Sequence, residues 1–260
     1  IQSRLPSAAK AKAIITKLPD EDWVVMSQQG LKPVHAGRFY VHTSTNRGAV
    51  PAGAVPIHIE ASRAFGTGGH ETTTGCLAML DRLKQQGKRF EIIADIGTGT
   101  GLLAFAACHL WSRAYLTASD IDPVSVDVTR DNALSNGYPL GMGQGQITLC
   151  AASGTDHSII QQRAPYDLII ANILAGPLIE LAPSLAQIIG EGGSLILAGL
   201  LNTQASAVIS AYRKLGFRLQ LREDVGDWPC LLLVRRKRYG WQRPSGADGR
   251  RTQPSGDFGT

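Results

Sequence analysis

The stretch that decides the fold is Ile92-Ile93-Ala94-Asp95-Ile96-Gly97-Thr98-Gly99-Thr100-Gly101. Its apolar first half predicts a buried strand over 92–96, its glycines predict a tight turn, and the apolar residues from Leu102 onward predict a helix. A strand that leads through a glycine turn into a helix N-terminus is how α/β proteins hold nucleotide-like ligands. The stretch therefore predicts an α/β fold with a ligand site at this turn.

The spacing of the glycines and of the acid before them narrows the choice of ligand. The run is G-x-G-x-G, whereas dinucleotide sites carry G-x-G-x-x-G, so a nicotinamide-dependent oxidoreductase is disfavoured. Asp95 would repel a pyrophosphate but suits a ligand with positive charge. S-adenosylmethionine (SAM) carries an ammonium and a sulfonium group, so we expect Asp95, Gly97 and Gly99 to bind SAM. For this segment taken alone, a plain structural turn is the alternative.

Strands and helices alternate on both sides of this motif. The periodicity predicts strands at 22–27, 38–43, 55–60, 115–119, 146–150, 167–171, 194–198, 217–224 and 230–236, and helices at 72–85, 102–111, 123–136, 177–188 and 203–215. Such alternation implies a mostly parallel sheet covered by helices on both faces. The turn at 226–229 is too short for a crossover, so the last two strands should be antiparallel.

The two ends of the chain differ in composition from the middle. Residues 1–20 are rich in Ala and Lys with few large apolar groups, and we expect a lead-in or the remnant of a missing N-terminal region. Residues 239–260 are rich in Gly, Pro, Ser and Arg without apolar periodicity, which predicts a disordered basic tail. The globular domain should therefore span residues 21–238.

The net charge of +5 comes entirely from the C-terminal end. Residues 235–260 hold seven basic and two acidic side chains, whereas residues 1–234 hold 19 of each. A neutral body argues against a protein whose main partner is nucleic acid, and a solvated tail is favoured over one that contacts RNA. No apolar run approaches the roughly 20 residues of a membrane span, and no signal-like apolar core begins the chain. We expect a cytoplasmic protein without a membrane partner.

The four cysteines, Cys76, Cys108, Cys150 and Cys230, are widely spaced and form no C-x-x-C pair. This spacing argues against a zinc site or a redox motif, and we expect no metal. We expect the four cysteines to be small buried thiols in a reducing compartment.

Two further polar residues follow predicted strands. Asp120 ends the strand that comes about twenty residues after the glycine turn, where an acid can accept hydrogen bonds from both ribose hydroxyls. Asp122, directly before Pro123, is better placed as the N-cap of the next helix. Asn172 follows the strand at 167–171, and its amide oxygen can accept a hydrogen bond from an amine and orient the nitrogen lone pair at a methyl group. The alternative for Asn172 is a helix cap.

The loop at 65–73 is a fourth candidate element. Its glycines permit close approach to a ligand, and Thr72 and Thr73 offer hydroxyl groups at a helix start. His70 is either a structural residue or a catalytic one, and the sequence leaves both open. The chain shows no nucleophile–base pair or metal-ligand cluster. This fits methyl transfer, because SAM is already activated and the protein mainly aligns the reactants.

Taken together, four blocks resemble the ribosomal protein L11 methyltransferase family (PrmA). They are A-F-G-T-G-G-H-E-T-T at 64–73, D-I-G-T-G-T-G at 95–101, S-D-I-D-P at 119–123 and A-N-I-L-A-G-P-L at 171–178. The second block is generic to class I methyltransferases, whereas the first and last are specific to the family. The resemblance covers roughly residues 20–236.

The resemblance implies a Rossmann-like class I methyltransferase with a mostly parallel seven-stranded sheet. It implies SAM-dependent methylation of lysine side chains and the N-terminal amine of ribosomal protein L11, free or on the ribosome, with no direct need for nucleic acid. It carries SAM contacts onto Thr73, Gly97, Asp120 and Asn172, and we expect Asn172 to be the catalytic residue. Family members also have an N-terminal substrate-docking domain that these residues do not show.

Two other functions remain open at this point. One is a class I methyltransferase that acts on another protein or on a small molecule. The other is a SAM-binding module without catalytic activity, although the intact Gly97, Gly99, Asp120 and Asn172 argue against it.

Overall fold

A computed structural model describes residues 33–59 and 69–237. Its main sheet has seven strands: β4 (Ile92–Ile96), β5 (Tyr115–Asp120), β6 (Ile147–Ala151), β7 (Tyr166–Asn172), β8 (Ile189–Ala198), β9 (Phe217–Val225) and β10 (Trp228–Arg235). They are ordered β6-β5-β4-β7-β8-β10-β9. The first five run parallel, and β10 is antiparallel to both its neighbours. The expected fold class is confirmed.

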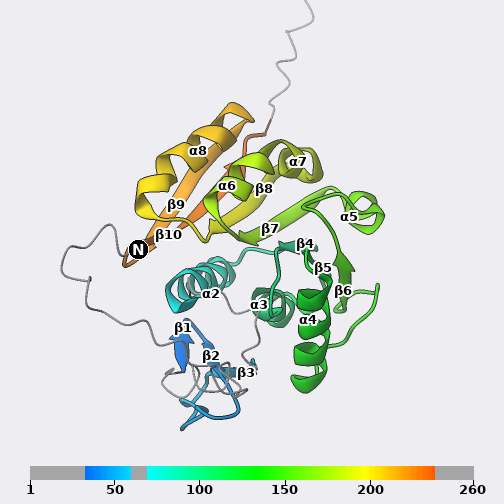
Figure 1. Ribbon diagram of the computed structural model, residues 1–260, viewed down its shortest axis with the longest axis vertical. Helices are drawn as coiled ribbons and strands as arrows, with labels where there is room; N and C mark the ends of the chain where they lie inside the picture. The colour runs from blue at the N-terminus through cyan, green and yellow to red at the C-terminus, as the bar shows by residue number, and fades with distance from the viewer. Residues whose placement is uncertain (1–32, 60–68, 238–260) are drawn as a thin grey trace, which may run out of the picture.

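Helices cover both faces of this sheet (Figure 1). One face carries α2 (Gly69–Gln85), α3 (Leu102–Leu110) and α4 (Pro123–Ser135), and the other carries α6 (Ala175–Glu180), α7 (Ala182–Ile188) and α8 (Ala205–Lys214). The short helices α5 (Ser158–Arg163) and η3 (Asn202–Gln204) lie in connections. Because the sheet is buried on both faces, its central strands are almost continuously apolar.

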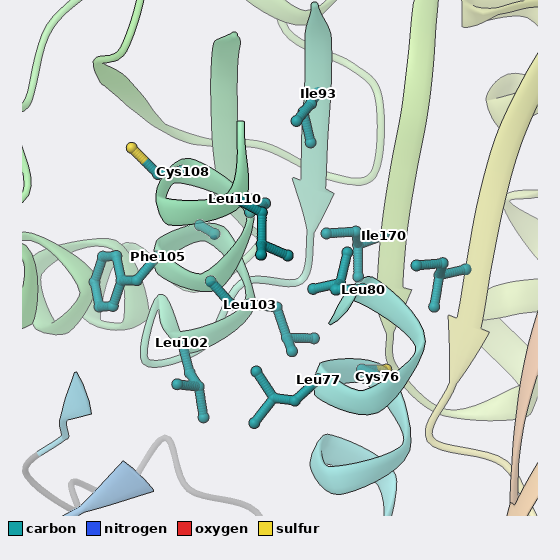
Figure 2. Packing of buried hydrophobic residues seen from close by; sticks show 14 of the residues in the cluster. Cys76, Leu77, Leu80, Ile93, Leu102, Leu103, Phe105, Cys108, Leu110 and Ile170 are labelled. Atoms are coloured by element: carbon teal, nitrogen blue, oxygen red, sulfur yellow. The ribbon is translucent and has the colours of Figure 1, made fainter. Parts of the chain in front are cut away.

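The core between α2, α3 and the sheet fixes the helices next to the glycine turn. Figure 2 shows Leu77 and Leu80 of α2 facing Leu103 of α3, with Ile93 and Ile170 of the sheet beside them. Leu77, Leu80, Ile93 and Ile170 have no exposed surface. Burial of side chains of this size contributes about 1.5–3 kcal/mol each, so this cluster holds α3 rigidly behind the turn.

A second, three-stranded sheet packs against α2. It consists of β1 (Val34–Ala36), β2 (Phe39–His42) and β3 (Val55–His58), with β1 and β2 antiparallel and β2 and β3 parallel. The strands expected at 38–43 and 55–60 form this separate sheet. β1 was not predicted, because three residues are too short to show a periodicity. The strand expected at 22–27 lies outside the described residues.

The single helix expected at 177–188 is wrong: two helices, α6 and α7, meet there at Leu181. Pro183 lies in the first turn of α7. Its ring would clash with the carbonyl of Ile179 in a continuous helix, so the chain must break before it. Two shorter details also differ, since β8 begins five residues earlier than expected and α5 was not predicted.

Three local predictions are confirmed. Asp122 is the N-cap of α4, because its side chain accepts a hydrogen bond from the backbone amide of Val124 at 3.0 Å. All four cysteines are buried and free. The β9–β10 connection is a tight antiparallel turn.

The contact between the small sheet and α2 yields a test of stability. Asp81 of α2 is 3% exposed and accepts hydrogen bonds from Arg38 Nε at 2.5 Å and Gln85 Nε2 at 2.8 Å. We expect Asp81→Ala to lower the free energy of unfolding by about 2 kcal/mol, because it removes a buried, charge-assisted pair of hydrogen bonds. Urea denaturation measures the change.

The matched control is Asp127→Ala, which breaks the exposed Arg130–Asp127 pair on α4. Surface pairs of this kind contribute less than about 1 kcal/mol. Equal losses in the two variants would show that the Arg38–Asp81 pair does not hold the small sheet in place.

Candidate functional site

A cavity of about 780 Å³ opens at the edge of the main sheet where the parallel strands end. Its walls come from the turn after β4, the ends of β5, β6, β7 and β8, and the starts of α2 and β10. The residues lining it include Thr72, Thr73, Gly97, Gly99, Asp120, Ile121, Ser153, Gly154, Asn172, Ile173, Leu174, Glu180, Gly199 and Trp228. A cavity of this size and place is typical of a small-molecule site in an open α/β sheet.

The glycine turn forms the floor of the cavity. Gly97 has a φ angle of +75°, and a Cβ at this position would lie 2.3 Å from Cγ2 of Ile173. Only glycine fits here, because any side chain would be strained and would collide with the end of β7. The carbonyl of Ser119 accepts hydrogen bonds from the amides of Gly97 and Thr98 at 2.8 and 2.9 Å, so β5 holds the turn in place.

Asp120 joins the turn to the end of β5. One carboxylate oxygen accepts a hydrogen bond from the Gly99 amide at 2.9 Å, and the other accepts one from the Asp122 amide at 3.0 Å. Each carboxylate oxygen has two lone pairs, so each can still accept one more hydrogen bond. Asp120 lines the cavity, and a pair of neighbouring hydroxyl groups would match these two acceptors.

Asp95 lies behind the turn and does not line the cavity. Its side chain is 1% exposed, Oδ2 accepts a hydrogen bond from the Thr98 hydroxyl at 2.7 Å, and Oδ1 has no partner among the described residues. Burial raises the pKa of this carboxyl from 3.8 to about 7, against the opposing effects of the Thr98 hydroxyl and the nearby Ala104 backbone amide, and the charge of Asp120 adds to the rise. A cation placed over the turn would reverse this shift.

Asn172 ends β7 and lines the cavity. It does not cap the following helix, because Leu174 holds the N-cap position of α6 and no side chain caps that helix. The residue directly after β8 packs against the backbone next to Asn172. Gly199 has a φ angle of +85°, and a Cβ there would lie 2.4 Å from the carbonyl oxygen of Ile173.

The structure brings five of the six predicted site residues to one cavity, namely Thr73, Gly97, Gly99, Asp120 and Asn172. Thr72 lines it as well, whereas the side chain of His70 lies outside the described residues. Five residues that line the cavity were not predicted: Ser153, Gly154, Glu180, Gly199 and Trp228. Glu180 ends α6, two residues beyond the last motif block, and the other four follow or begin strands without a motif, so only the fold brings them to the cavity.

Within residues 33–59 and 69–237, no group of three or more His, Cys, Asp or Glu side chains is placed to hold a metal ion. No helix in the same ranges combines the length and the hydropathy that crossing a bilayer would require.

The fold and the cavity define a class I, SAM-dependent methyltransferase. A precorrin-6y C5,15-methyltransferase from Geobacter metallireducens GS-15 has the same fold, with a TM-score of 0.50 at 14% identity over 62% of this chain and 87% of that one. A ribosomal protein L11 methylase from Lactobacillus delbrueckii subsp. bulgaricus is closer in structure, with a TM-score of 0.66. It is 27% identical and aligns over 80% of this chain and 99% of that one.

The particular family is the ribosomal protein L11 methyltransferases (PrmA), to which this chain belongs. The family model matches residues 1–236. A ribosomal protein L11 methyltransferase from Caulobacter sp. (strain K31) is 42% identical over 224 residues, which is 86% of this chain and 75% of the relative. One from Brucella suis (strain ATCC 23445 / NCTC 10510) is 44% identical over 217 residues, 84% of this chain and 74% of the relative.

The residues of the cavity fit SAM, the cofactor of this class. Gly97 and Gly99 line the cavity without side chains, so a ligand can contact the backbone of the turn. The unpartnered Oδ1 of the buried Asp95 offers negative charge beneath that backbone. Asp120 offers paired acceptors beside the turn. These three features match the backbone contact, the cationic end and the ribose that SAM would present.

The burial of Asp95 gives a prediction with a defined sign. The folded protein binds a proton at Asp95 up to about pH 7, whereas the unfolded chain releases it near 3.8. The stability of the ligand-free protein should therefore fall as the pH rises through this window. Asp95→Asn removes the cost of ionising this buried carboxyl, so above pH 7 we expect it to raise the free energy of unfolding by about 1–4 kcal/mol. The same substitution removes the negative charge available to SAM.

Urea denaturation without SAM, at several pH values between 4 and 8 (roughly the span set by the two pKa values), measures this. Asp122→Asn is the control, because this exposed N-cap keeps its cap as asparagine. Parallel pH profiles for wild type and Asp95→Asn would contradict the account of a buried, titrating carboxyl.

Proposed function

We propose that this protein transfers methyl groups from SAM to amino groups of ribosomal protein L11, both lysine side chains and the N-terminal amine. The single observation that carries the proposal is the place of Asn172 in the same cavity as the glycine turn and Asp120. The names of the relatives support L11 as the substrate. We also infer a cytoplasmic location, because the proposed substrate is a ribosomal protein.

We assign SAM binding to Thr73, Gly97, Gly99, Asp120 and Asn172, with Asp95 acting through its charge from behind the turn. Topology divides the cavity into two ends. Asp120, Ile121, Ser153 and Gly154 lie where β5 and β6 end, and Asn172, Gly199 and Trp228 lie toward β7, β8 and β10. With the ribose at Asp120, the acceptor amine enters at the end that holds Asn172. We assign residues 21–238 to the methyltransferase domain.

Asn172 and the residues around it would favour the neutral form of the amine and orient its lone pair. When bound, SAM supplies a methyl group on a positively charged sulfur. A lysine amine has a pKa near 10.4 in water, so it must release a proton to solvent water before it can accept that group. The apolar side chains of Ile173, Leu174 and Trp228 line the cavity with Asn172, and contact with them favours the neutral amine. The amide oxygen of Asn172 then accepts an N–H hydrogen bond and orients the lone pair.

The test is an assay with purified chain, L11 and SAM, read by mass spectrometry of L11 peptides. We expect wild type to add methyl groups at amino nitrogens. Asn172→Ala should lower the rate constant for methyl transfer by about 100-fold, because a positioning hydrogen bond is lost. SAM affinity should fall by less than tenfold, since Asp120 and the glycine turn remain.

Asn202→Ala is the matched control. Asn202 lies near the same edge of the sheet, in η3, but it does not line the cavity and contacts Arg222 instead. This variant should keep the wild-type rate. A normal rate in Asn172→Ala would overturn the role of Asn172, and methylation of side chains other than amines would overturn the proposed reaction.

A further inference from the structure

Charge is distributed unevenly between the edge of the main sheet where the parallel strands end and the opposite edge where they begin. Residues 1–234 are nevertheless neutral as a whole. Exposed acids, namely Asp122, Asp156, Glu180 and Asp227, lie at the edge that carries the cavity. The opposite edge carries the exposed basic residues Lys88, Arg89, Arg113, Arg213, Lys214, Arg218, Arg236 and Lys237, against the exposed acids Glu91 and Glu191.

Five of these basic residues form one patch, which we call the basic edge patch: Arg213, Lys214, Arg218, Arg236 and Lys237. They come from three segments that the fold joins, namely the end of α8, the start of β9 and the end of β10 (Figure 1). The Arg236 amide donates to the Gly216 carbonyl at 2.9 Å, and the Gly216 amide donates to the Arg213 carbonyl at 3.1 Å.

Two further members, Arg218 and Lys237, lie beside these segments. Arg218 is the strand partner of Val234, two residues before Arg236. Lys237 lies over β8, since its Cε is 3.1 Å from the position a Cβ would take on Gly192. The patch therefore runs across three neighbouring strands and the helix end beside them.

The charges of the patch are unneutralised. No member takes part in an ion pair within the described residues, whereas the exposed Arg130 and Arg222 are each paired with an aspartate. Glu191, beside Gly192 on β8, is exposed and pairs with none of them. Cationic side chains left in this state attract polyanions and lose counterions on binding them.

We propose that the basic edge patch docks an RNA strand through its phosphates, while the cavity at the opposite edge stays open. The cluster of unpaired positive charges favours a polyanion as the ligand. The choice of RNA rests on the proposed function, since a ribosomal protein is assembled on RNA. Anionic membranes are disfavoured, because within residues 33–59 and 69–237 none of the exposed large apolar side chains comes from the segments that form the patch.

The experiment measures binding of fluorescein-labelled oligouridine to the full chain by fluorescence anisotropy at about 50 to 200 mM salt. The test variant is Arg213→Gln/Lys214→Gln/Arg218→Gln. We expect at least a tenfold loss of RNA affinity. The slope of log affinity against log salt concentration should become shallower by about two, because each lost phosphate contact on a single strand contributes about 0.7. The matched control, Lys88→Gln/Arg89→Gln/Arg113→Gln, has the same charge change elsewhere on that edge and should lose less than twofold.

Calorimetric SAM titration and methylation of free L11 should match wild type in both triple variants. This separates the RNA proposal from the proposed function, which fails if wild type does not methylate amino groups of L11. Equal loss of RNA binding in both variants, no RNA binding by wild type, or tighter binding to phosphatidylserine vesicles than to RNA would each overturn the basic edge patch as an RNA site.

Discussion

The hydrogen bond from the Gly99 amide to the Asp120 carboxylate is the contact on which the site depends. It ties the glycine turn of β4 to the end of β5, and the Ser119 carbonyl holds the same turn through Gly97 and Thr98. The turn is also held from α4, where the Thr129 hydroxyl donates to the Gly99 carbonyl at 2.9 Å. The backbone that approaches the ligand is therefore rigid before anything binds, and this preorganisation lowers the entropic cost of binding.

Two carboxyl groups, those of Asp95 and Asp120, lie beside this turn and differ in burial and hydrogen bonding. Asp120 borders the cavity with both oxygens engaged by backbone amides, whereas Asp95 is buried beneath it with Oδ1 unpartnered and its pKa raised to about 7. A cationic ligand relieves the unfavourable burial of Asp95, so binding and stability should be linked. On a larger scale, the acids around the cavity and the basic edge patch divide the molecule into two surfaces of opposite sign.

Much of this site could be predicted from the sequence because it follows strand ends. Gly97 follows a strand of strong apolar pattern, and Asp120 and Asn172 end two others. Parallel strands bring such positions to one edge. Other features depend on contacts that a sequence does not display. Trp228 reaches the cavity only because β10 inserts between β8 and β9, and Pro183 divides a helix whose apolar pattern continues through it. The neutral balance of residues 1–234 likewise concealed the separation of charge between the two edges.

The measurement that tests the central claim most directly is isothermal titration of the purified chain with SAM, alongside Asp120→Ala and a parallel titration with NADH. We expect wild type to bind SAM and not NADH. We expect Asp120→Ala to bind SAM at least tenfold more weakly, because it removes both the cavity acceptors and the hydrogen bond that holds the turn. SAM binding that is unchanged in Asp120→Ala, or NADH binding in place of SAM, would contradict the account of this cavity.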